Sequence, residues 1–141
     1  MIDLSRYDLK LDVYKDFVKG LERLATCKRK QVGAIIVSED YQEVFAVGYN
    51  GSPPGFPHCC GEDKGGAQGC GCVHAEMNAC LKANMTSKGF MICTMYPCVR
   101  CAQAIIAKRK ITKVFTLEEH INTDGILLLK KAGIECPGIK L

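Results

Sequence analysis

The sequence lacks the features that mark several common classes of protein. It contains no run of five or six basic residues, and its formal net charge is only +4, so a nucleic-acid-binding arm is not indicated. No apolar stretch approaches the roughly 20 residues that a membrane-spanning helix needs. Residues 1–17 carry acidic side chains and never build the apolar core of a signal peptide. We therefore expect a cytoplasmic protein that binds neither nucleic acid nor a membrane.

The chain also lacks internal repeats and any stretch with the composition of an interdomain linker. Its 141 residues, 48% of them apolar, suit one hydrophobic core, and we expect a single domain over 1–141. The first predicted helix covers 7–25, where apolar residues recur at three- and four-residue steps. These apolar residues are Leu9, Val13, Phe17, Leu21 and Leu24.

Short β-branched runs alternate with helical patterns through the rest of the chain. The strands are expected at 31–38, 43–51, 89–95, 111–117 and 134–136, and the helices at 74–84, 98–109 and 123–133. The first two strands are separated by only a few residues, which favours an antiparallel hairpin. A hairpin followed by alternating helix and strand predicts a three-layer α/β/α fold, with a five-stranded mixed sheet and helices on both faces.

Cysteine is abundant, with ten residues, and many of them fall in or near a long Gly/Pro-rich loop over 51–72. In a reducing compartment this number indicates metal binding or catalysis more than a disulfide framework. A loop of that length without secondary structure is unusual in a small domain and points to function or to a metal site.

Four residues form the pattern that carries chemistry. Cys98 and Cys101 lie three apart at the start of a predicted helix, so both sulfurs can face one metal ion, and His74 can add a nitrogen from another helix start. Three protein ligands leave the fourth tetrahedral position open, which is the arrangement of catalytic rather than structural zinc. Glu76 is then available to accept and redeliver a proton from the water that the metal activates.

Several motifs resemble one family, the deoxycytidylate (dCMP) deaminases of the zinc-dependent cytidine deaminase superfamily. "HAE" at 74–76 followed by "PCVRC" at 97–101 is the signature of zinc deaminases. "TCKRKQVGAIIV" at 26–37 and "AVGYNGSPPGFPHC" at 46–59 are similar to further segments of the family. The resemblance implies a cytidine deaminase-like fold and hydrolysis of dCMP to dUMP and ammonia, which feeds the synthesis of dTTP.

The resemblance also implies roles for individual residues. Glu76 carries protons to N3 and to the departing amine of cytosine, while the backbone amides of Ala75 and Cys98 hold the edge of the base. Asn50 contacts the nucleotide, although an Asn-Gly pair is also a common turn signal. A guanidinium suits phosphate geometry, so Arg29 is expected at the substrate phosphate, with an ordinary surface position as the alternative.

Two positions depart from the family's pattern. Tyr96 precedes the proline where smaller or acidic residues are frequent in the family. His120 stands where many relatives have a tyrosine, and it is expected to contact the substrate or to lie in a surface loop. Both departures concern substrate recognition and leave the reaction type unchanged.

The family further implies regulation and assembly. Many members are homohexamers that are activated by dCTP and inhibited by dTTP, with Mg²⁺ accompanying the triphosphate. The expected effector residues lie in the loop after the second strand and are Asn50, Gly51, Ser52 and Gly55. Backbone amides in such a loop are suited to hold phosphates.

Some relatives carry a second, non-catalytic zinc, and the remaining cysteines match its positions. Cys27 and Cys59 match the first two ligands. Cys70 or Cys72 would supply the third and His58 or Cys60 the fourth, and the C-x-C spacing lets us expect that only one of Cys70 and Cys72 binds. A closed four-ligand zinc would order the long loop, whereas the alternative is a set of free thiols.

Two alternative functions stay open on the sequence. One is another deaminase of the superfamily, acting on a free nucleoside, on guanine or on a tRNA adenosine; a tRNA editor should show a broader basic surface than this chain has. The other is a zinc-binding module without catalysis, which would require four closed ligands at the His74 site and would leave Glu76 without a role.

Overall fold

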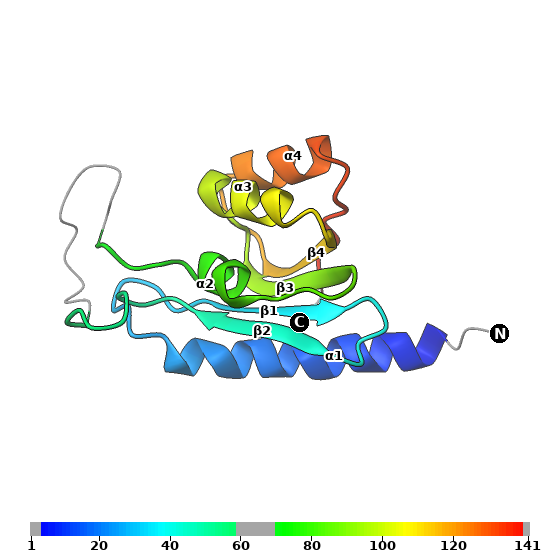
Figure 1. Cartoon of the computed structure of the whole chain (residues 1–141), viewed down its shortest axis with the longest axis horizontal. Helices are drawn as coiled ribbons and strands as arrows, with labels where there is room; N and C mark the ends of the chain where they lie inside the picture. The colour runs from blue at the N-terminus through cyan, green and yellow to red at the C-terminus, as the bar shows by residue number, and fades with distance from the viewer. Residues whose placement is uncertain (1–3, 59–69, 140–141) are drawn as a thin grey trace.

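The computed structural model describes residues 4–58 and 70–139, which form a mixed sheet with helices on both faces (Figure 1). In chain order the elements are α1 (Leu4–Leu21), the 3₁₀-helix η1 (Glu22–Leu24), β1 (Gly33–Ser38), β2 (Val44–Tyr49), α2 (Ala75–Lys82), β3 (Gly89–Met95), α3 (Val99–Lys108), β4 (Ile111–Glu118) and α4 (Asp124–Lys131). The predicted mixed sheet between helical layers is confirmed.

The strand order of the sheet is β2-β1-β3-β4. β1 pairs antiparallel with both β2 and β3, which confirms the predicted hairpin, and β3 pairs parallel with β4. β2, β3 and β4 therefore run in the same direction. The segments that follow these three strands, and the segment that leads into β1, all meet at one edge of the sheet.

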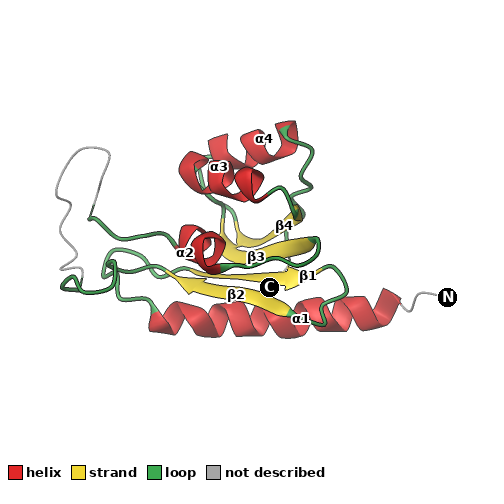
Figure 2. Ribbon diagram, viewed as in Figure 1, coloured by secondary structure: helices red, strands yellow, loops and turns green. Residues whose placement is uncertain are grey.

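Alternating side chains of the central strands divide the core into two layers. Ile35 and Val37 pack with α1 on one face, while Ala34 and Ile36 pack with residues of α2, α3 and α4 on the other. Figure 2 shows α1 alone beneath the sheet and the other three helices above it. Burial on both faces explains why β1 reads as a continuous apolar run.

Of the five apolar residues that predicted α1, only Leu21 lies on the face that the helix buries. Leu9 and Val13 are 50% and 56% exposed, whereas Val18 and Leu21 are buried, with Tyr14 packed beside them. A row of residues four apart moves around a helix by about 40° per step, so it drifts off one face over about four turns. No helix within the described ranges, α1 included, is long and apolar enough to cross a membrane.

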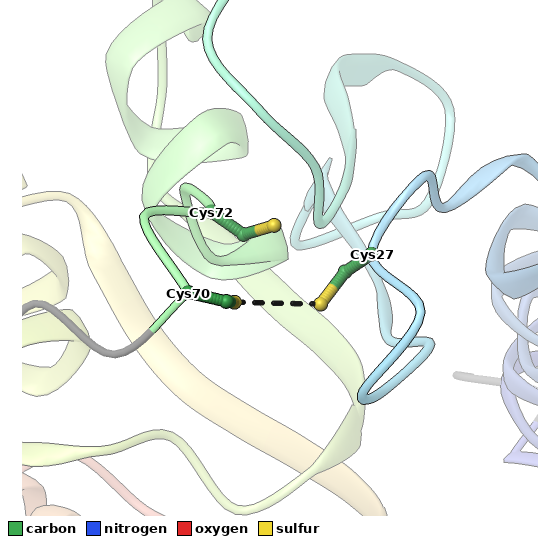
Figure 3. Close-up of side chains that lie close together, drawn as sticks. All are labelled: Cys27, Cys70 and Cys72. Atoms are coloured by element: carbon green, nitrogen blue, oxygen red, sulfur yellow. Dashed lines mark hydrogen bonds between the residues drawn. The ribbon is translucent and has the colours of Figure 1, made fainter. Parts of the chain in front are cut away.

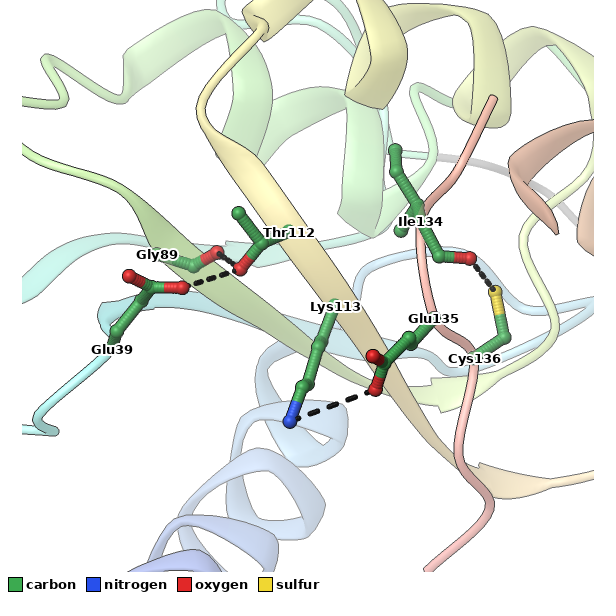
Figure 4. A network of polar contacts seen from close by, with 7 residues as sticks. All are labelled: Glu39, Gly89, Thr112, Lys113, Ile134, Glu135 and Cys136. Atoms are coloured by element: carbon green, nitrogen blue, oxygen red, sulfur yellow. Dashed lines mark hydrogen bonds and ion pairs between the residues drawn. The ribbon is translucent and has the colours of Figure 1, made fainter. Parts of the chain in front are cut away.

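The prediction of a fifth strand over 134–136 is wrong. This segment runs beside β4 and makes only isolated parallel bridges, one of which pairs Lys113 with Glu135. Pro137 follows directly and has no N–H to donate, which interrupts the ladder between the two bridges. Beyond it, the Thr116 N–H donates to the Pro137 carbonyl over 3.2 Å and the Ile139 N–H donates to the Thr116 carbonyl over 2.8 Å. Figure 4 shows the segment beside β4, with Lys113 Nζ 3.7 Å from Glu135 Oε2. The described sheet consequently has four strands.

Candidate metal centre and active site

Segments from four parts of the chain surround the edge of the sheet where β2, β3 and β4 end. Asn50 follows β2, Tyr96 follows β3, His120 lies two residues past β4, and residues 26–32 lead into β1. Ligands of open α/β sheets commonly bind outside the carboxyl ends of the strands. Sheet topology therefore assembles residues at this edge that are far apart in the sequence.

A cavity of about 380 Å³ opens at this edge. Its lining combines three kinds of group: the metal-binding side chains His74 and Cys98, the carboxylate of Glu76, and the cations Arg29 and Lys30. This volume lies in the range of pockets that bind small molecules. The cavity is thus large enough to hold a reacting group near Glu76 and a charged group near the cations.

The geometry of His74, Cys98 and Cys101 fits a zinc ion. The Nδ1 atom of His74 lies 3.5 Å from the Sγ of Cys98 and 3.4 Å from the Sγ of Cys101. Zinc bonds of ~2.3 Å to sulfur and ~2.0 Å to nitrogen at a tetrahedral angle place such atoms ~3.5 Å apart. The three side chains form one of the two His/Cys clusters in the described part of the chain that could hold a metal.

Two of the three predicted ligands begin helices, as the sequence indicated. His74 is the N-cap of α2 and Cys98 is the N-cap of α3, and neither side chain caps its own helix by a hydrogen bond. The side chains are therefore free to face the ion. The amides of the first helical turns have no partner within the helix and favour negative charge nearby, which supports thiolate ligands.

Two glycines allow the helices that carry the ligands to pack closely. A Cβ on Gly48 of β2 would overlap the carbonyl oxygen of Ala75 and lie 2.9 Å from the Ala79 nitrogen in α2. A Cβ on Gly125 of α4 would overlap the carbonyl oxygen of Pro97, the residue just before Cys98. Both ligand-bearing turns thus depend on close backbone contact with a neighbouring element.

The two thiols and the imidazole of the triad are hydrogen-bonded to one another. Hydrogen bonds from Cys101 and His74 lower the pKa of Cys98 to about 3. The pKa of Cys101 is raised, because it hydrogen-bonds with the Cys98 sulfur and is buried. The hydrogen bond to Cys98 also raises the pKa of His74. Cys98 is therefore prepared as a thiolate, which is the form that binds metal.

Glu76 occupies a buried position in the first turn of α2 and is only 4% exposed. Burial is the main cause that raises the pKa of its carboxyl group above the usual value. A carboxyl group with a raised pKa, beside a metal site and lining the cavity, is suited to accept and release a proton during a reaction. The predicted role of Glu76 as a proton carrier therefore has the environment that it needs.

The basic segment before β1 faces the cavity. On composition alone, "CKRK" at 27–30 is typical of a solvated helix end, yet both Arg29 and Lys30 line the cavity. Lys30 also lies close enough to His74 for its charge to oppose the raised pKa of the imidazole. Sequence reasoning identified Arg29 and missed Lys30. The basic cluster at 27–30 was the only sequence feature that indicated Lys30. The sheet topology is needed to show that this cluster faces the cavity.

The loop after β4 adds two polar groups to the cavity. His120 and Asn122 both line it, and the Asn122 backbone N–H donates to His120 Nδ1 over 3.0 Å. A neutral His120 therefore carries its proton on Nε2 and keeps a donor for a ligand. Asn122 was not identified from the sequence; its Oδ1 accepts from the Asp124 N–H at the start of α4.

A second cluster joins Cys27, Cys70 and Cys72 (Figure 3). The sulfurs of Cys27 and Cys70 lie 3.7 Å apart, close to the ~3.8 Å that two thiolates span on a tetrahedral zinc. Both Cys70 and Cys72 lie within reach of one ion, so the geometry does not restrict binding to one of them. The three sulfurs fit three of the four ligand positions of a structural zinc ion.

Three predicted ligands of this zinc are not part of the cluster: Cys59, predicted as the second ligand, and His58 and Cys60, the alternatives for the fourth. His58 is exposed, and it belongs to no metal-binding cluster in ranges 4–58 and 70–139. Cys59 and Cys60 lie outside the described residues, so their role as ligands stays a prediction. The predicted effector residues Gly51, Ser52 and Gly55 do not line the cavity.

Replacing Cys27 by serine should lower the zinc content from about two ions per chain to about one. The serine hydroxyl is a poor zinc ligand, and loss of the ion should also lower the melting temperature. Metal analysis by mass spectrometry and thermal unfolding measure both effects. Cys136→Ser is the matched control, because Cys136 belongs to neither cluster. An unchanged zinc content in Cys27→Ser would refute the second site.

Comparison with known proteins gives the same family by sequence and by structure. Residues 11–118 match the family of the cytidine and deoxycytidylate deaminase zinc-binding region. The deoxycytidylate deaminase of Saccharomyces cerevisiae is 31% identical over 121 residues, which cover 78% of this chain and 38% of the relative. ComE operon protein 2 of Bacillus subtilis is 33% identical over 131 residues, covering 83% of this chain and 64% of the relative. This chain thus spans less than two thirds of either relative.

A solved structure shows the same fold over nearly the whole chain. The dCMP deaminase of the cyanophage S-TIM5, in complex with dCMP and dUMP, has a TM-score of 0.79 and 32% identity, covering 91% of this chain and 95% of that chain. The family match includes His74, Glu76, Cys98 and Cys101. The chain belongs to the cytidine and deoxycytidylate deaminase family, whose members share this zinc-binding region.

Proposed function

We propose that this protein hydrolyses dCMP to dUMP and ammonia. The observation that carries the proposal is one cavity that brings the metal-binding triad and Glu76 together with Arg29 and Lys30. A nucleoside, which has no phosphate, would need only the metal-binding triad and Glu76. The phosphate of a nucleotide carries negative charge, which two adjacent cations can bind. The similarity to a dCMP deaminase that was solved with dCMP and dUMP supports the same substrate.

The reacting end of the substrate would lie beside the N-termini of α2 and α3. His74, Cys98 and Cys101 would hold the zinc ion, which supplies the Lewis acidity that makes a nucleophile of water at neutral pH. The first-turn amide of Ala75 and the amide of Cys98 are placed at helix starts, where N–H groups have no helical partner. These N–H groups would hold the polar edge of the cytosine.

Glu76 would move the protons of the reaction. It would accept a proton from the attacking water and deliver it to N3 of cytosine. It would then accept the proton of the new C4 hydroxyl and deliver it to the amine, which leaves as ammonia while the C4 carbonyl forms. Burial of the carboxyl group raises its pKa, which makes it a better proton acceptor than an exposed glutamate. The buried site also keeps bulk water from competing for these protons.

Arg29 and His120 would bind the rest of the nucleotide. Arg29 can bind a phosphate oxygen through its guanidinium group, and His120 offers the Nε2 proton. Asn50 lines the cavity and has one amide N–H beyond the one that it donates to the Lys30 carbonyl. Direct contact of Asn50 with the nucleotide stays a prediction.

Rates of ammonia release from dCMP, dCTP, deoxycytidine and cytidine test the proposal. The zinc-loaded protein should show a kcat/KM for dCMP at least about tenfold above that for deoxycytidine, because a charged hydrogen bond is worth about 1.5 kcal/mol or more. A preference for deoxycytidine would refute the nucleotide assignment. Absence of turnover with every substrate, although zinc is bound, would favour a non-catalytic zinc module.

Regulation is a separate proposal that rests on the family resemblance. We expect activation by dCTP with Mg²⁺, inhibition by dTTP, and assembly into a homohexamer. The loop that contains Gly51, Ser52 and Gly55 is the proposed effector site. Initial rates with each triphosphate, together with sedimentation of the protein, would test these expectations.

A further inference from the structure

Asn50 makes four hydrogen bonds to the loop that carries the two cavity cations. Its Oδ1 accepts from the Val32 N–H over 2.8 Å, and its Nδ2 donates to the Lys30 carbonyl over 2.5 Å. Its backbone carbonyl accepts from the Thr26 N–H over 3.0 Å, and its N–H donates to the Val32 carbonyl over 3.4 Å. Asn50 is only 5% exposed. One buried residue thus fixes both ends of residues 26–32, which we name the cation loop.

The side-chain amide is the part of this contact that only asparagine supplies. Oδ1 accepts on one side and Nδ2 donates on the other, so the amide joins two backbone groups of the cation loop, on Lys30 and Val32. A carboxylate in its place would turn an acceptor toward the Lys30 carbonyl, which is itself an acceptor. A shorter side chain would leave at least one of these buried backbone groups without its partner.

Gly51, which follows Asn50, links the contact between Asn50 and the cation loop to the metal centre. Gly51 donates to the Val73 carbonyl over 3.2 Å and accepts from the Val73 N–H over 2.8 Å. Val73 directly precedes His74, the first ligand of the triad. On its other side, Gly51 lies so close to Thr26 that a Cβ would overlap the threonine Oγ1. Residues 50 and 51 therefore lie between the cation loop and the segment that ends at His74.

We propose that Asn50 is a positioning residue, which holds Arg29 and Lys30 at a fixed distance from the metal centre and so selects a substrate with a phosphate. The inference rests on the proposed function, because it assigns the phosphate of that substrate to the cation loop. It differs from direct contact between Asn50 and the nucleotide. If Asn50 contacted the nucleotide directly, it would affect substrate binding even without Arg29 and Lys30. If it is a positioning residue, it affects substrate binding only through these two cations.

The test compares substitutions at Asn50 in two backgrounds. Asn50→Asp keeps the shape and the acceptor for Val32 but removes the donor for Lys30; Asn50→Ser removes the amide without adding charge. Each is made in the wild-type chain and in the Arg29→Ala/Lys30→Ala chain. Asn78→Asp is the matched control, because Asn78 Nδ2 donates over 3.0 Å to the carbonyl of Tyr49, which precedes Asn50, and not to the cation loop.

Both Asn50 variants should raise KM for dCMP roughly tenfold while kcat changes less than about threefold. The lost contact is with the phosphate, which takes no part in the reaction at C4, so substrate binding is weakened and the chemical step is not. For deoxycytidine, kcat/KM should stay within about twofold. In the Arg29→Ala/Lys30→Ala chain the Asn50 substitutions should add nothing, which is the mark of a shared pathway in a double-mutant cycle. Asn78→Asp should leave the preference for dCMP unchanged.

Equal losses with dCMP and deoxycytidine would overturn the inference, as would an Asn50 effect that persists without the two cations. Hydrogen exchange of the Val32 amide gives a readout that needs no substrate. Its exchange should accelerate in Asn50→Ser, and unchanged protection would refute the contact itself. A wild-type protein without preference for dCMP would refute the proposed function; a wild-type preference that survives Asn50→Ser would refute only the positioning role.

Discussion

Replacing Glu76 by glutamine is expected to lower kcat for deamination by about 10²–10⁴-fold, the usual contribution of a general acid–base group. Glutamine has nearly the same shape and fits the buried position, but it cannot accept and redeliver a proton. Because Glu76 is not one of the clustered ligands, the zinc content should not change. Steady-state rates, metal analysis and thermal unfolding of the purified variant measure these three properties.

Glu135→Gln is the matched control for this substitution. Glu135 is an exposed carboxylate that pairs with Lys113 over 3.7 Å at the far edge of β4. Surface ion pairs contribute little to stability, so the control should keep wild-type activity and nearly the wild-type melting temperature. Loss of zinc in Glu76→Gln would show that the carboxylate holds the metal instead of moving protons.

Replacing Gly125 by alanine should weaken the metal centre from outside it. The added Cβ would overlap the carbonyl oxygen of Pro97 and lie 2.9 Å from the carbonyl carbon of Cys98. Both are backbone atoms of the turn that carries two ligands, so α4 or the turn must move. Overpacking of this kind costs about 1–3 kcal/mol, which exceeds the helix preference of alanine over glycine, about 0.5–1 kcal/mol. Melting temperature, zinc content and turnover should all fall.

Gly20→Ala separates this steric effect from the general effect of alanine in a helix. Gly20 lies near the end of α1, and a Cβ there would meet nothing within 4 Å. This variant should gain about 0.5–1 kcal/mol of stability and keep full activity. If Gly125→Ala behaves like Gly20→Ala, then close packing of α4 on the turn before Cys98 does not support the metal centre.

The sequence was sufficient for the metal-binding triad, because its spacing has a chemical meaning of its own. His74, Cys98 and Cys101 are recognisable since two sulfurs three residues apart and a histidine at a helix start suit one tetrahedral ion. The strands were also predictable, because a buried strand such as β1 is a continuous apolar run between turn residues. These features depend on local patterns, which a single sequence contains.

The features that the sequence did not reveal depend on contacts between distant segments. Lys30 and Asn122 become cavity residues only because the sheet order brings the start of β1 and the end of β4 to one edge. The face of α1 that packs on the sheet carries Val18 and Leu21, and Tyr14 of the same helix stacks on Tyr41, which lies far from it in the sequence. The predicted final strand is interrupted at Pro137, which has no N–H to donate to β4, so only isolated bridges form on either side of it.

The most direct measurement is the reaction of zinc-loaded protein with dCMP in water enriched in ¹⁸O. Hydrolysis at C4 should place one ¹⁸O atom in each dUMP and release one ammonia for each dUMP formed, and Glu76→Gln should show neither product above background. Mass spectrometry of the nucleotide and an ammonia assay on the same sample give both quantities. Unchanged dCMP in the presence of folded protein with zinc at His74, Cys98 and Cys101 would contradict the proposed reaction.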